Sequence, residues 1–86
     1  METTVVYKEA SDHARAVEDF LRDFKRQTGK TLATLNPDTP EGAVFCEVHD
    51  IMEYPTVIAL DSQGRQQQLW RGLPLPTISE VSYYVS

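Results

Sequence analysis

The chain contains few residues whose types and spacing could do chemistry, and the first of these is its one thiol, Cys46. A single cysteine cannot form an internal disulfide or the CxxC pair of a dithiol redox site. His49 follows three residues later, a spacing that suits two metal ligands, but a zinc site needs more ligands and nothing nearby supplies them. We therefore expect no metal and no cofactor, and Cys46 remains a candidate reactive thiol.

Ser11, Asp12 and His13 form the second candidate group. A serine beside a histidine suggests a hydrolytic nucleophile and its base. Residues two apart on a helix do not face each other, however, and no third group is evident to orient the histidine. Serine and aspartate are also preferred caps at the start of a helix. The group is thus either the remnant of an active site or simply a helix cap, formed by Ser11 or Asp12.

A short helix is expected after the turn at residues 36–40, where a threonine precedes a proline that suits the first helical position. Val44, Phe45 and Val48 define its apolar face. At about 100° per residue, Cys46 falls nearly opposite that face, so we expect its thiol to be partly exposed. An inert thiol and an intermolecular disulfide are both compatible with that position.

The remaining elements follow from hydrophobic periodicity. β-branched and aromatic runs predict strands, and apolar residues three and four apart predict helices. The first helix has the clearest stripe and should stop at Gly29. Gln66, Gln67 and Gln68 make the fourth strand polar and place it at a sheet edge. We therefore predict one α/β domain spanning residues 1–86, with the order β-α-β-α-β-β-α. The strands are expected at residues 3–7, 31–35, 56–60 and 65–71, and the stripe of the first helix comprises Ala14, Val17, Phe20, Leu21 and Phe24.

Composition and charge narrow the partners. The net charge of −5 argues against a nucleic acid or an anionic membrane as the main partner, because both require clustered basic residues. No apolar run approaches the length of a membrane span, and no secretory signal opens the chain. Together with the single cysteine, these features favour a reducing, cytoplasmic setting. A mature secreted form without its signal would fit the same sequence.

The predicted order, together with residues 52–58 (Met-Glu-Tyr-Pro-Thr-Val-Ile), resembles the thioredoxin superfamily in its small, glutaredoxin-like form. The resemblance covers essentially the whole chain and implies a four-stranded mixed sheet with helices on both faces. It also implies a cis bond between Tyr54 and Pro55, with the Tyr54 backbone beside the active site, where an extended peptide can pair. Family members carry CxxC or a single cysteine between the first strand and the first helix. Here that place is taken by residues 11–14, which contain no thiol.

The resemblance therefore implies a non-catalytic interaction module that binds a protein or peptide partner, without dithiol oxidoreductase activity. A second functional class is a redox protein that uses Cys46. A third is a small thiol-binding or glutathione-binding protein, although enzymes of the glutathione-transferase type have an additional helical domain for which this chain is too short. A homodimer could form through the edge strand at residues 65–71. We call the expected binding residues the remnant-site surface: Ser11, Asp12, His13, Tyr54, Pro55 and Thr56.

Trp70, Tyr83 and Tyr84 are large aromatic residues near the end of the chain. Side chains of this kind usually pack their rings and leave their polar tips in water. We expect all three to pack rather than to form an exposed patch.

Overall fold

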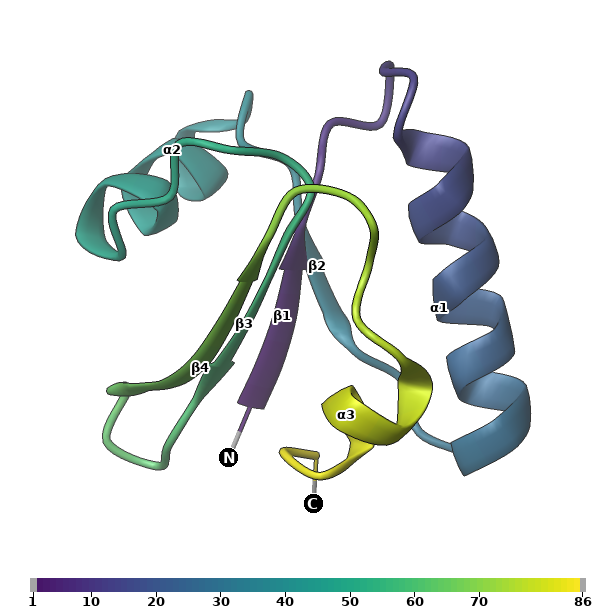
Figure 1. Ribbon diagram of the computed structural model, residues 1–86. Coiled ribbons are helices and arrows are strands. Elements are labelled where there is room, and N and C mark those ends of the chain that lie inside the picture. The colour runs from purple at the N-terminus through teal and green to yellow at the C-terminus, as the bar shows by residue number, and fades with distance from the viewer. Residues whose placement is uncertain (1, 86) are drawn as a thin grey trace.

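A mixed four-stranded sheet forms the centre of the protein in the computed structural model, which describes residues 2–85 (Figure 1). The strand order is β2-β1-β3-β4, with β1 parallel to β2 and antiparallel to β3, and β3 antiparallel to β4. The predicted mixed sheet is confirmed, and so is the edge position of the fourth strand. The strands are β1 (Glu2–Val6), β2 (Ala33–Leu35), β3 (Thr56–Leu60) and β4 (Gln66–Arg71).

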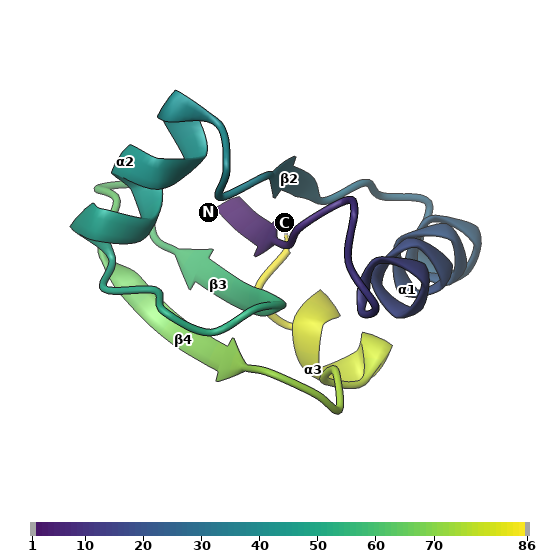
Figure 2. The ribbon, with the colours of Figure 1, turned by 90° about the horizontal axis from the view of Figure 1, so that it is seen from above.

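The helices cover both faces of the sheet, as predicted. α1 (Ala14–Thr28) and α3 (Ile78–Ser82) lie on one face, and α2 (Pro40–Val48) lies on the other (Figure 2). α1 ends at Gly29, whose positive φ of 75° is the left-handed stop that glycine adopts without steric cost. Between residues 2 and 85, no helix has the length and apolar character needed to cross a bilayer.

The face covered by α1 and α3 holds the larger core. Val5 and Val57 project from the two central strands against Val17 and Phe24 of α1, and all four side chains have no exposed surface. Val81 of α3 closes the same cluster. The predicted apolar stripe of α1 is confirmed. Over the four turns of this helix, residues three and four apart keep the same side toward the sheet.

The side of α2 that faces the sheet is only partly the one that the sequence suggested, since Phe45 packs there but two other predicted residues do not. Cys46 is only 7% exposed and packs with Val6, Ile51 and Ile58. The expectation of a partly exposed thiol is therefore wrong. Two of the residues predicted to be buried lie on the outer side of this helix: Val44 is 62% exposed and Val48 is 70% exposed.

A close backbone contact explains this rotation of α2. Gly42 is buried in its first turn, and a Cβ atom on Gly42 would lie only 1.8 Å from the carbonyl oxygen of Asn36. Only glycine permits this approach, so the side of the helix that carries Gly42 must face inward. Cys46 lies four residues later on that same side and is buried with it.

Three of the four strands differ from the prediction at their boundaries: β1 begins and ends one residue earlier, and β2 and β4 begin later. β1 ends at Val6 rather than at Tyr7, although the Tyr7 N–H still donates to the Leu35 carbonyl over 3.0 Å. β2 begins at Ala33 and has three residues. It is an outer strand with mostly exposed side chains, so little apolar burial extends it. The predicted start of α2 is confirmed, because the Thr39 hydroxyl accepts from the Gly42 N–H, and at the start of α3 Thr77 forms a capping box with Glu80.

Candidate functional site

Two side chains of the segment between β1 and α1 form hydrogen bonds with the backbone of one residue, Lys8. The Ser11 hydroxyl donates to the Lys8 carbonyl over 2.5 Å, and the Lys8 N–H donates to Nε2 of His13 over 3.0 Å. His13 itself is the N-cap residue of α1, and no side chain there accepts from the helix N–H groups. The predicted capping of α1 by Ser11 or Asp12 is therefore wrong, because the Ser11 side chain points back to Lys8.

These bonds exclude a hydrolytic pair of Ser11 and His13. A neutral histidine accepts at one ring nitrogen only, and here Nε2 is already occupied by the Lys8 N–H. Ser11 directs its proton to a carbonyl rather than to the imidazole. The two side chains clamp the Lys8 backbone from both of its polar groups, and the His13 ring packs edge-on against Tyr7 with 6.5 Å between centroids.

The clamp on Lys8 places its ammonium group at the loop that precedes β3. Lys8 Nζ lies 5.4 Å from the centroid of the Tyr54 ring and 3.7 Å from a carboxylate oxygen of Asp38. The cation thus links the loop after β1 to the proline loop by a cation–π contact, and to the turn before α2 by an ion pair. Sequence reasoning missed Lys8 and Asp38, since one lysine after a strand and one aspartate in a turn carry no distinctive spacing.

The proline loop is fixed on one side and leaves Tyr54 open. The Tyr54–Pro55 bond is cis, as the resemblance implies. The Pro55 carbonyl accepts from the Gly72 N–H over 2.8 Å, and the Thr56 hydroxyl donates to the Glu53 carbonyl over 2.6 Å. Within residues 2–85, neither the N–H nor the carbonyl of Tyr54 has a hydrogen-bond partner.

The two segments of the remnant-site surface meet at one end of the sheet (Figure 1). β1 ends there and β3 begins there, with Val6 paired to Thr56. The accessibility of the six residues differs, however. Asp12 is exposed; Ser11, His13 and Tyr54 are half-buried; Pro55 and Thr56 are buried. Pro55 and Thr56 can therefore shape the backbone that a ligand contacts, but their side chains are hardly accessible to it.

Tyr54 links this surface to the α2 face of the sheet. Its ring packs against the cluster that contains Cys46. Burial raises the pKa of the Tyr54 hydroxyl, and the neighbouring Cys46 thiol and the Asp38 carboxylate raise it further. The hydroxyl is therefore protonated at neutral pH and can act only as a neutral hydrogen-bonding group.

The position of Cys46 does not suit thiol chemistry. Its side chain is buried under α2, whereas the resemblance implies a thiol at the start of α1, a helix that covers the opposite face of the sheet (Figure 2). A thiolate must be reachable to attack a disulfide. Across the described residues, no group of three or more His, Cys, Asp or Glu side chains is arranged to hold a metal ion.

Comparisons with known proteins decide the fold. No family model matches the chain, and no curated protein matches it in sequence. Among solved structures, thioredoxin 1 from the thermophilic eubacterium Thermosipho africanus TCF52B superimposes with a TM-score of 0.68, covering 99% of this chain and 90% of that one. The chain has a thioredoxin-like fold. At 15% identity the likeness establishes architecture alone, and this thioredoxin-like domain has serine, aspartate, histidine and alanine at residues 11–14.

Proposed function

We propose that this thioredoxin-like domain is a non-catalytic interaction module that binds an extended segment of a partner protein at the remnant-site surface. The observation that carries the proposal is the backbone of Tyr54, whose N–H and carbonyl have no partner within residues 2–85. Paired to an added strand, these two groups would supply main-chain hydrogen bonds of the kind used in β-strand addition.

The absence of catalysis rests on the two places where a thiol would act. At the start of α1, Ser11 and His13 hold the Lys8 backbone and are not free to react. Cys46, the one thiol, is buried. A protein with one inaccessible thiol cannot run a dithiol exchange cycle. An unpaired cysteine also suits a reducing compartment such as the cytoplasm.

Charge suggests which segment would bind. Asp12 is the exposed side chain of the remnant-site surface, and the chain carries a net charge of −5. A basic or neutral segment would therefore be favoured over an acidic one. Lys8 does not reverse this preference, because its ammonium group is already paired with Asp38 and the Tyr54 ring.

A peptide selection followed by mapping tests this proposal. Random peptides are selected on the intact protein, and the bound peptide is mapped by backbone amide shifts. We expect the largest shifts at Ser11–His13 and at Tyr54 and Thr56. Asp12→Lys should weaken a basic peptide by about tenfold, the effect of one close charge reversal. Glu47→Lys makes the same charge change at an exposed position on α2 and should leave binding unchanged.

Asp12 is the cleaner probe because replacing His13 or Tyr54 would also remove internal contacts. Selected peptides that shift residues away from both segments, or that bind the Asp12→Lys variant as tightly as the parent, would show that the remnant-site surface is not the binding site. Failure to enrich any peptide would count against an interaction module of this kind.

The two catalytic alternatives have direct assays. We expect insulin reduction to stay at the level of a control without protein. Activity that is lost in Cys46→Ser would establish the redox alternative instead. Glutathione titration followed by amide shifts tests the thiol-binding alternative, for which we expect no saturable change around Ser11 or Tyr54.

A homodimer through β4 is a second candidate, favoured by one observation. β4 pairs with β3 on one side only, and its Gln66, Gln67 and Arg71 side chains are exposed. Its other edge could pair with a second copy. Sedimentation over a range of concentrations tests this: a dimer that dissociates in Gln67→Pro, while circular dichroism shows an intact fold, would support edge pairing over the remnant-site surface.

A further inference from the structure

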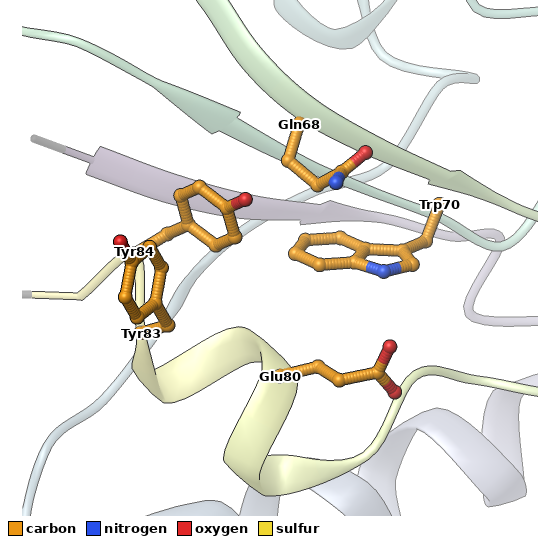
Figure 3. A pocket seen from close by; sticks show the side chains of 5 residues that line it. All are labelled: Gln68, Trp70, Glu80, Tyr83 and Tyr84. Atoms are coloured by element: carbon orange, nitrogen blue, oxygen red, sulfur yellow. The ribbon is translucent and has the colours of Figure 1, made fainter.

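A hollow of about 220 Å³ opens between β4 and the segment around α3, and none of its lining residues belongs to the remnant-site surface (Figure 3). Gln68 and Trp70 line it from the strand, Glu80 from the helix, and Tyr83 and Tyr84 from the chain that follows. Trp70 also packs against the core under α1 and α3, which fixes one wall of the hollow. Three of the five lining residues are aromatic.

The aromatic rings are arranged edge to face. Trp70 and Tyr84 have centroids 5.6 Å apart at 73°, and Tyr83 and Tyr84 have centroids 5.1 Å apart at 80°. In such a pair the edge of one ring covers one face of the other, and each face that stays free carries the negative side of the ring quadrupole. Tyr83 is 80% exposed, so the expectation that all three aromatic residues pack is wrong for Tyr83.

Glu80 adds a full negative charge whose position is fixed. One of its carboxylate oxygens, Oε1, accepts from both the N–H and the hydroxyl of Thr77, each over 3.0 Å. Within residues 2–85, Oε2 has no hydrogen-bond partner. Figure 3 shows this carboxylate and the Trp70 indole on one side of the hollow, with the two tyrosines on the other. No lysine or arginine is among the five lining residues.

We propose that this hollow binds a quaternary ammonium group. Aromatic faces and one carboxylate attract a cation, and recognition of quaternary ammonium by such walls is a general use of cation–π contacts. Methyl groups spread the charge and leave no N–H donor that requires an acceptor, which suits walls made mainly of rings. A lysine ammonium is compact and strongly hydrated, so its desolvation by aromatic walls costs more.

The probe is choline, added to the intact protein and followed by NMR at the indole N–H of Trp70. The chain has one tryptophan, so this signal is unambiguous. We expect a saturable shift in the tens of millimolar or below. The neutral isostere of choline, with a quaternary carbon in place of the nitrogen, matches its shape without its charge and should bind at least about tenfold more weakly.

Substitutions of lining residues test the walls of the hollow without disrupting the fold. Tyr83→Ala removes an exposed ring and should weaken choline several-fold, whereas Tyr83→Phe keeps the ring and should retain binding. Glu80→Gln removes the charge but can still close the capping box, and should also weaken choline. Glu47→Gln is the matched control on α2. Equal binding of choline and its isostere, no saturable shift, or a shift indifferent to Tyr83→Ala and Glu80→Gln would overturn the proposal.

Discussion

The two faces of the sheet are covered by different means. Under α1 and α3, large side chains around Phe24 are fully buried, and the helix is positioned by a continuous apolar stripe. Under α2, the inward side carries Gly42 and Cys46, while Val44 and Val48 lie in solvent. Hydrophobic periodicity thus determines which side of a long helix is buried. In a short helix with apolar residues on several sides, one close backbone contact can outweigh this periodicity.

The two faces should differ most in the unfolding free energy that is lost when a phenylalanine side chain is removed from each. Phe24→Ala empties a fully buried site and should cost about 3–5 kcal/mol of unfolding free energy. Phe45→Ala on α2 removes a half-buried ring and should cost clearly less. Urea denaturation of both variants measures this. Equal losses would mean that the α2 face holds the domain together as strongly as the α1 face.

Gly42→Ala tests the close approach that orients α2. In an ordinary helix interior this change stabilises by up to about 1 kcal/mol. Here the new methyl group would meet the Asn36 carbonyl, so we expect a loss of roughly 1–3 kcal/mol. Thermal or urea unfolding gives the sign. Ala43→Gly, at an exposed position next to it, serves as the control and should cost only the intrinsic helix preference. Stabilisation by Gly42→Ala would remove our explanation for the rotation of α2.

Replacement by serine should cost more unfolding free energy at Cys46 than at Val48. The sequence pattern suggests the reverse order. Cys46→Ser buries a hydroxyl in an apolar cluster and should cost roughly 1–3 kcal/mol. Val48→Ser acts at a side chain that is 70% exposed and should change stability by no more than about 0.5 kcal/mol. In the folded parent, the thiol should react slowly with a thiol reagent and rapidly in denaturant. Fast labelling of the folded protein would place Cys46 at the surface.

The smallest expected effect concerns Glu80 and is visible only through pH. Hydrogen bonds from the Thr77 N–H and then from its hydroxyl lower the pKa of the Glu80 carboxyl. A folded pKa below the unfolded one adds stability above the unfolded value, and this stability is lost as the pH falls through the folded value. The stability gap between the parent and Glu80→Gln should therefore be present at neutral pH and close in acid. A gap that is constant with pH would contradict the ionised cap.

The sequence predicted the parts of the fold whose signals are local. The stripe of α1, its stop at Gly29, the cap at Thr39 and the apolar run of β3 all appear where expected. At the candidate site, the sequence identified the proline loop and the missing thiol. It did not identify Lys8, whose role depends on Ser11 and His13 turning back to its backbone, since those hydrogen bonds form only in the folded chain.

By itself, the sequence determined the order of the elements, the edge position of β4 and the lack of a thiol before α1, because periodicity, polar composition and residue identity are properties of the chain alone. The tertiary structure decided which side of α2 is buried. It also decided that Tyr54 keeps an unpaired backbone and that Trp70, Glu80 and Tyr83 meet around one hollow. Each of these depends on how the folded backbone brings groups together or keeps them apart, which no periodic pattern in the chain encodes.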